Sequence, residues 1–310
     1  MAERAPKKKG PAILCSGIAV QDIVMRVKNF PDPGTKVSAS DFIVTGGGCA
    51  ANAALTAARL NARVQFAGPL GGSNDAVSER VVADLTAEGI DCSGVVRVVG
   101  GTASVSLILL DALGEKTIAT RRGVKLAGVL PADADALVAA ADAVLVDNRF
   151  PEFVMAVCRA ATKRRIPIVI DLDQSTKVKD SLLALGTHVI ASAEAMRGTT
   201  GLEDNTAALQ KLSKQLPGFV AVTDGPHGVY WLEGGMMQHM PAFTVDAIDT
   251  LAAGDVFHGA FTVALAEQRE LADCMRFASA TAAIKCTRFG GASGTPKRAE
   301  VEKFLEQQAA

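Results

Sequence analysis

Residues 249–261 read DTLAAGDVFHGAF, a run of small residues that passes directly into an apolar pattern of helical spacing. The pattern predicts a helix over residues 254–267, whose first turn would present unpaired backbone N–H groups and the positive end of the helix dipole. The small side chains of Ala252, Ala253 and Gly254 would let an anion approach these N–H groups closely. The stretch therefore predicts an anion site at a helix N-terminus.

Asp255 is the residue of chemical interest in this stretch, because it falls in the first helical turn beside the predicted anion. A carboxylate in that place can accept a proton from a hydroxyl group that attacks a phosphoryl group. The alternative is a plain helix N-terminal acid, which the helix dipole favours by itself. Spacing alone leaves both interpretations open.

The composition restricts the class of protein. The chain has 310 residues, of which 49% are hydrophobic and 21% are charged, so a globular fold with a full core is expected. Its 32 basic and 33 acidic residues give a net charge of -1, which argues against nucleic-acid and membrane-surface partners. Aromatic residues make up only 5%, so a platform for stacking single-stranded bases is also disfavoured.

The cysteine pattern and the N-terminal residues indicate a cytoplasmic protein. None of the six cysteines has C-x-x-C spacing, as expected for reduced thiols in the cytosol. No apolar run reaches the roughly 18 residues of a membrane span. Residues 1–10 are basic and polar, without the apolar core of a signal peptide, and are interpreted as a flexible tail.

Short apolar runs alternate with helical patterns along the chain, which predicts an α/β fold with a doubly wound, mostly parallel sheet. The expected strands are residues 12–20, 64–67, 143–147, 167–171, 188–192 and 219–223. The expected helices are residues 50–60, 75–88, 254–267 and 271–288.

Residues 24–44 and 95–121 interrupt this alternation with strand-like segments that leave no room for crossover helices. Strands that follow one another without helices favour antiparallel pairing. We therefore expect a small β-sheet lid, inserted in two pieces into one α/β domain over residues 11–310. A lid of this kind would cover a ligand cleft.

The stretch 249–261 resembles the signature of the ribokinase-like (PfkB) carbohydrate kinase family. Gly47-Gly48 followed by Asn52 resembles the family's sugar-contacting motif, and residues 223–228 (TDGPHG) are similar to its T-x-G-x-x-G nucleotide motif. The resemblance covers about residues 13–296. It implies an ATP-dependent sugar kinase that uses Mg²⁺ and transfers the γ-phosphoryl group to a hydroxyl of a small carbohydrate.

The resemblance implies roles for the sugar side of the site. Asp255 would be the general base, and the backbone of Ala252 to Gly254 would stabilise the transferring phosphoryl group. Asp22, expected at the carboxyl end of the first strand, and Asn52 would bind sugar hydroxyls. A turn-capping role for Asp22 and an N-cap role for Asn52 are the alternatives. Gly47 and Gly48 would let the backbone approach the sugar.

The nucleotide side follows the family less closely. Thr223, Gly225 and Gly228 would lie beside the nucleotide. The family's N-x-x-E metal motif is altered here, because Ser192 stands at the Asn position and Glu194 comes one residue early. Glu194 would then reach the metal through water, unless it is an exposed helix N-terminal acid. Asp249 resembles a family position near a monovalent cation such as K⁺.

Two cations are candidates for binding an anionic group of the substrate. Arg149 follows the strand at 143–147, and Lys36 lies on the predicted lid. Arginine binds phosphate or sulfonate oxygens in a bidentate manner, although both residues could equally be solvated surface charges. Residues 238–260, 276–279 and 285–288 resemble sulfofructose kinases, with ketohexokinases more distant. This likeness implies a ketose or an acidic sugar such as sulfofructose.

Two other functions remain open on this scaffold. A nucleoside kinase would need an aromatic platform, for which the lid offers only Phe30 and Phe42. A catalytically inactive sugar- or nucleotide-binding homologue would not need the intact Asp255 and Gly254. The resemblance also implies a homodimer, because family members often pair through their lids.

Overall fold

A computed structural model describes residues 10–308, and the tail expected over residues 1–10 lies outside them except for Gly10. The large sheet consists of β1 (Ala12–Ser16), β4 (Arg63–Ala67), β9 (Ala143–Asp147), β10 (Ile168–Leu172), β11 (His188–Ser192), β12 (Phe219–Thr223), β13 (Val229–Glu233) and β14 (Met236–Met240). Their order across the sheet is β14-β13-β12-β11-β10-β9-β1-β4. Every neighbouring pair from β12 to β4 is parallel, and β13 and β14 add an antiparallel edge. The doubly wound, mostly parallel sheet is thus confirmed.

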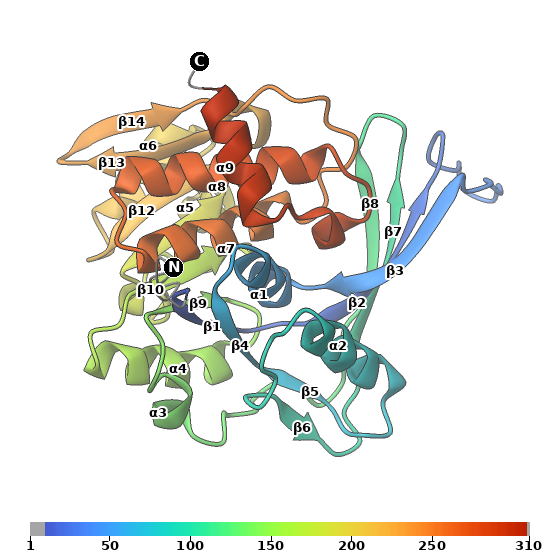
Figure 1. Cartoon of the computed structure of the whole chain (residues 1–310), viewed down its shortest axis with the longest axis horizontal. Coiled ribbons are helices and arrows are strands. Elements are labelled where there is room, and N and C mark those ends of the chain that lie inside the picture. Colours follow the sequence, from blue (N-terminus) through green and yellow to red (C-terminus); the bar gives the residue numbers. More distant parts are fainter. Residues whose placement is uncertain (1–9, 309–310) are drawn as a thin grey trace, which may run out of the picture.

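Helices cover both faces of this sheet (Figure 1). One layer contains α1 (Cys49–Arg59), α7 (Ala253–Ala266), α8 (Leu271–Cys286) and α9 (Arg298–Gln307), and the other contains α3 (Ala134–Leu137), α4 (Pro151–Lys163), α5 (Ala193–Thr200) and α6 (Asn205–Ser213). Side chains alternate between the two cores, as with Ile13 and Leu14 on β1. Burial on both faces explains why these strands read as continuous apolar runs. No helix within residues 10–308 is long and apolar enough to span a membrane.

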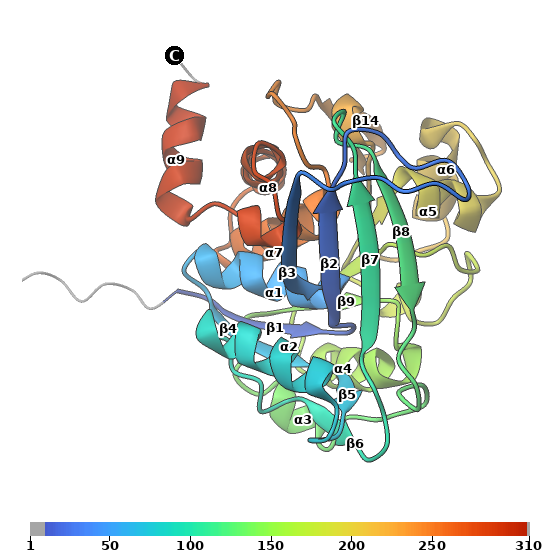
Figure 2. The same cartoon turned by 90° about the vertical axis from the view of Figure 1, so that its right-hand side faces the viewer.

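The lid is a second sheet made of β2 (Val20–Arg26), β3 (Asp41–Gly47), β7 (Ser104–Leu110) and β8 (Lys116–Arg121). Figure 2 shows its strands side by side in the order β3-β2-β7-β8. The expectation of purely antiparallel pairing is wrong for the central pair, because β2 and β7 are parallel. β2 and β7 leave the main domain in the same direction, and each is followed in the chain by its own antiparallel partner, β3 for β2 and β8 for β7.

The expected first strand, residues 12–20, is divided between the two sheets. β1 ends at Ser16, and Val20 begins β2 of the lid. The turn between them presses against β9, since a Cβ atom on Gly17 would lie 2.2 Å from Oδ2 of Asp147. Asp22 therefore lies on a lid strand, and its expected place at the carboxyl end of the first strand is wrong.

Three elements near the base of the lid complete the fold. α2 (Ala76–Ala87) packs against β2 and β3, and β5 (Pro69–Gly71) pairs with β6 (Val96–Val98) in a small parallel sheet. The side chain of Asp75 caps α2 by accepting a hydrogen bond from the Ser78 N–H. This start agrees with the helix expected over residues 75–88.

Candidate active site

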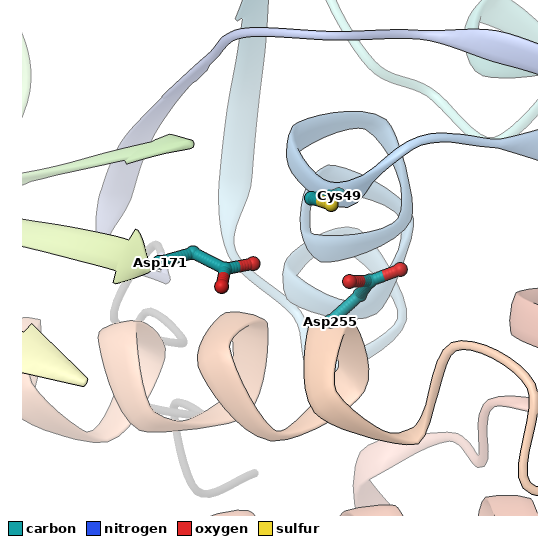
Figure 3. Close-up of side chains that lie close together, drawn as sticks. All are labelled: Cys49, Asp171 and Asp255. Carbon is teal, nitrogen blue, oxygen red and sulfur yellow. The ribbon is translucent and has the colours of Figure 1, made fainter. Parts of the chain in front are cut away.

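The lid meets the large sheet at the carboxyl ends of its central strands, where three side chains from distant parts of the sequence converge. Figure 3 shows Cys49 at the start of α1, Asp171 on β10 and Asp255 on α7 facing one another. One ligand atom of each lies within 4.8 Å of the others. Carboxyl ends of parallel strands form the usual ligand crevice of open α/β sheets.

Asp255 has the electrostatics of a base that works near neutral pH. It lies in the first turn of α7, half-buried, and its Oδ2 accepts a hydrogen bond of 2.6 Å from Nδ2 of Asn52. Burial raises the pKa of Asp255 to about 7, helped by the charges of Asp173 and Asp22 and opposed by the Asn52 hydrogen bond. A pKa close to the working pH suits a general base. The contact also shows that Asn52 orients this carboxyl group.

The start of α7 presents backbone donors to the same space. Ala252 is the N-cap in a left-handed conformation (φ 63°). The Ala253 N–H, one of the three expected donors to the phosphoryl group, instead donates to the Thr250 carbonyl at 3.3 Å. Within residues 10–308, the N–H groups of Ala252, Gly254 and Asp255 have no acceptor. Three donors at a helix N-terminus thus remain available to an anion.

Gly254 has no structural reason to be glycine. It is exposed, its φ is ordinary for any residue, and a Cβ atom there would meet nothing within 4 Å. Because Cα–Cβ bonds tilt toward the N-terminus of a helix, a side chain here would extend toward the end of α7 at which the N–H donors are exposed. The missing side chain therefore fits the close approach of a ligand.

Asp171 is a member of the site that the sequence analysis did not single out. It is 2% exposed, and its Oδ2 has no hydrogen-bond partner among the described residues. Burial raises its pKa well above the usual value, and the charge of Asp255 raises it further. In the sequence, the position of Asp171 at the carboxyl end of the strand expected over residues 167–171 was the signal that could have identified it as a site residue.

His258 packs beside this pair of carboxyl groups. Its Nδ1 lies 2.7 Å from the Gly254 carbonyl oxygen and 3.5 Å from Oδ2 of Asp171, and its Nε2 lies 3.2 Å from the Ile190 carbonyl oxygen. Burial lowers the pKa of His258. The ring thus joins the first turn of α7 to β11 and the carboxyl group of Asp171.

Asp22 and the glycine pair form the lid side of the site. Asp22 is 7% exposed, and burial raises its pKa to about 6 against an opposing hydrogen bond from Ser106. A Cβ atom on Gly47 would lie 2.0 Å from Oδ2 of Asp22, so only glycine leaves room for this carboxyl group. Gly48 has φ 95° and approaches the Ile18 carbonyl closely. A cavity of about 250 Å³ borders Gly47 and Asn52 along β3, α1 and α2.

Asp147 and Arg149 follow one another at the end of β9. The Asp147 carboxylate is fully buried and accepts backbone N–H bonds from Ile18 (2.8 Å), Ala50 (3.1 Å) and Arg149 (2.9 Å). It thereby ties the β1–β2 turn to the start of α1. The Arg149 guanidinium pairs with Asp173, while its Nε is buried without a partner among the described residues.

Other candidate residues lie apart from this cluster. Lys36 is exposed in the connection between β2 and β3 and forms no ion pair within residues 10–308. Glu194 is exposed in the first turn of α5, as its helix N-terminal alternative requires. Asp249 is fully buried next to Lys285.

The segment expected to bind nucleotide forms a tight turn between β12 and β13. Gly228 has φ 90°, and a Cβ atom there would lie 2.1 Å from the Met240 carbonyl oxygen, so packing requires this glycine. Gly225 has φ 49° and faces open space. Thr223 ends β12 and is half-buried, with its hydroxyl 3.4 Å from the Ala191 carbonyl oxygen.

Comparison with known proteins gives a consistent result. A model of the pfkB family of carbohydrate kinases matches residues 11–298. The ribokinase of Haemophilus influenzae is 30% identical over 294 residues, covering 92% of this chain and 95% of that protein. A crystal structure from Agrobacterium tumefaciens, provisionally named a ribokinase, is 35% identical with a TM-score of 0.92, covering 97% of this chain and 99% of that chain. Arabidopsis thaliana ribokinase, solved with ribose and ATP, is 25% identical with a TM-score of 0.82, covering 96% and 99%.

Proposed function

Because this chain belongs to the PfkB family of carbohydrate kinases, it is a phosphotransferase that acts on a sugar hydroxyl, and we propose that it transfers the γ-phosphoryl group of ATP to a small furanose sugar such as ribose. The observation that carries the proposal is the start of α7, where Asp255, oriented by Asn52, stands beside free backbone N–H donors. This arrangement places a proton acceptor and an anion site within one helical turn.

The reaction follows from these groups. The sugar hydroxyl lies next to Asp255, which takes its proton as the hydroxyl oxygen forms a bond to the γ-phosphorus. The bond from that phosphorus to the bridging oxygen breaks, and ADP leaves with the bonding electrons. The N–H groups of Ala252, Gly254 and Asp255 stabilise charge on the transferring group, at roughly 2.7–4 kcal/mol for each well-placed donor.

We assign the nucleotide to the turn that contains Thr223 and Gly225, on the same edge of the sheet. The complex of the Arabidopsis relative with ribose and ATP supports both substrates. Mg²⁺, which neutralises phosphate charge when bound with ATP, prefers carboxylate oxygens and water. Asp171, whose buried Oδ2 has no partner in the described part of the chain, and the exposed Glu194 offer such ligands. Cys49 does not suit this metal, because burial raises the pKa of its thiol and keeps it protonated.

The charges near the reacting group favour a neutral sugar. The site contains five aspartates and one arginine, Arg149, which is already paired with Asp173. The aspartates are Asp22, Asp147, Asp171, Asp173 and Asp255. An anionic group on the sugar, close to Asp255, would meet these acids with only the already paired Arg149 to balance its charge.

Arg149 supports a second candidate acceptor, a ketose with an anionic group such as sulfofructose. Its buried Nε has no hydrogen-bond partner within residues 10–308, so one donor of the guanidinium remains for a substrate oxygen. A nucleoside is less well supported, because Phe42 pairs with Met25 on the opposite face of the lid from Asp22.

A coupled ADP-release assay over ribose, fructose, sulfofructose and nucleosides tests the proposal. We expect turnover with a furanose sugar. Arg149→Gln should raise the KM for the acceptor at least tenfold only if the acceptor is anionic. Arg159→Gln, an exposed arginine on α4, is the matched control. ADP release that stays at the ATP-only rate with every acceptor would contradict the proposal and favour an inactive binding homologue.

We also propose that the protein forms a homodimer through the outer face of its lid. This face carries Ile23, Leu107 and Phe42, and the last two are 43% and 55% exposed. An exposed sheet face is normally polar, so an apolar one fits an interface with a second copy. Sedimentation should show a dimer that Leu107→Glu converts to a monomer, and a wild-type monomer at assay concentration would overturn the assignment.

A cytoplasmic location fits the thiols. All six cysteines are free, and four of them are buried. Proteins of oxidising compartments more often pair their cysteines. Fractionation of the native host with a cytosolic marker would test the location, and recovery with a secreted marker would contradict it.

A further inference from the structure

Lys285, near the end of α8, carries a buried positive charge for which the reaction above has no role. Its side chain is 0% exposed, as is that of its partner Asp249. The Nζ donates to the Asp249 main-chain oxygen at 2.7 Å and lies 3.1 Å from the Oδ1 atom of the same residue. A long, flexible lysine is rarely buried this completely, so its position needs an explanation.

Asp249 is the centre of the loop that leads to α7. Its Oδ1 accepts the Leu251 N–H at 2.8 Å, and its Oδ2 accepts the N–H groups of Gly290 and Gly291 at 2.8 and 2.9 Å. The residue thus joins the loop before Asp255 to the segment after α8. Burial lowers the pKa of Lys285, and the adjacent Asp249 carboxylate opposes this shift.

The same loop also contacts α8 and the lid. The N–H groups of Ile248 and Asp249 donate to the Cys286 carbonyl at 2.9 and 3.1 Å. The Thr250 hydroxyl donates to the Gly114 carbonyl, in the turn between β7 and β8, at 3.3 Å. A shift of this loop would therefore move both the first turn of α7 and its contact with the lid.

An ammonium group and a monovalent metal ion are equivalent in this setting. Both carry one positive charge, and both bind main-chain carbonyl and carboxylate oxygens. Lys285 presents its charge to one oxygen of each kind, at the residue that resembles a family position near a monovalent cation. Because the ammonium is covalently attached to α8, it binds without the entropy cost of capturing a free ion.

We infer that Lys285 is a positioning residue that supplies, from within the chain, the monovalent charge that holds the loop before Asp255, so that the enzyme needs no K⁺. The inference rests on the phosphotransferase activity of the family and not on the identity of the sugar. A displaced loop would move Asp255 and the N–H donors relative to the phosphoryl group. Misplacement of about 1 Å can cost on the order of 10²-fold in rate.

Lys285→Ala tests the inference, because it removes the charge and leaves space for a free cation. We expect kcat to fall about 10- to 10²-fold with the sugar KM nearly unchanged. K⁺, NH₄⁺ or propylammonium should restore at least a third of the loss, whereas tetramethylammonium at equal ionic strength should not. Lys303→Ala, on the exposed face of α9, is the matched control. Loss of activity without any cation rescue, or a kcat within twofold of wild type, would overturn the inference.

Two measurements keep the test decisive if that variant folds poorly or the sugar is misassigned. Wild-type kcat should change less than twofold when K⁺ replaces tetramethylammonium, and a larger activation would overturn the inference without any variant. Thermal unfolding needs no sugar: K⁺ should raise the Tm of Lys285→Ala and leave that of the wild type unchanged, since a ligand stabilises only the state that binds it. Equal Tm shifts in both proteins would refute the K⁺ site while leaving the proposed function untouched.

Discussion

Asp255→Asn should lower kcat by about 10²–10⁴-fold, because the amide cannot accept the proton of the attacking hydroxyl. The neighbouring structure should persist, since an amide at this position can still accept a hydrogen bond from Asn52, as the Oδ2 atom does at 2.6 Å. Steady-state ADP release gives kcat, and circular dichroism with thermal unfolding reports the fold. The ATP KM should change little, because Asp255 acts on the sugar side.

The matched control for this variant is Asp273→Asn. Asp273 is also an acid in the first turn of a helix, α8, but it is exposed and follows the carboxyl end of α7, the opposite end of that helix from Asp255. It should keep kcat within twofold of wild type. Wild-type turnover by Asp255→Asn would remove the general-base assignment and leave Asp255 as a helix N-terminal acid.

The same group predicts the pH dependence. The base works only when deprotonated, and the pKa of Asp255 is raised by burial to about 7. Log kcat/KM should therefore fall with unit slope as the pH drops below about 7 and level off above it. A profile flat down to pH 5 would show that a carboxylate with an ordinary pKa, or no base, limits the reaction.

Asp147→Ala should lower the free energy of unfolding by about 2–4 kcal/mol, because three backbone N–H groups lose their acceptor. Two of these bonds are partly open to water, which reduces the loss. The variant should also lower kcat, because Asp147 holds the start of α1, which carries Asn52. Urea unfolding monitored by fluorescence of the single tryptophan gives the stability.

Asp142→Ala is the control at the opposite end of β9. The Asp142 side chain is exposed and accepts a single backbone N–H bond, from Ala12 at 2.7 Å. The substitution should cost about 0.5–1.5 kcal/mol, the net worth of one ordinary hydrogen bond. Equal losses of unfolding free energy in both variants would show that Asp147 is only a hydrogen-bond acceptor at a strand end and does not hold the β1–β2 turn against α1.

Local pattern was enough to locate most elements of the large domain. The strands at 143–147, 188–192 and 219–223 were predicted to the residue, because strands buried on both faces are short apolar runs with clear boundaries. The helices after Gly48 and Ala252 were placed within one residue, because small residues precede each apolar pattern. The prediction for residues 12–20 was wrong, since an apolar run does not reveal that its two halves belong to different sheets.

The motif at 249–261, together with Gly47, Gly48 and Asn52, was sufficient to identify the family and the candidate base, because both segments are local and each shapes a helix start. Only the tertiary structure shows that Asn52 contacts Asp255 and that Asp171 belongs to the site. It also shows that Asp147, an acid at the end of a strand, holds the start of α1 in place. It also placed the ammonium of Lys285 on Asp249, 36 residues away in the chain. Such contacts depend on strand order and helix packing, which bring distant residues together and leave no spacing pattern along the sequence.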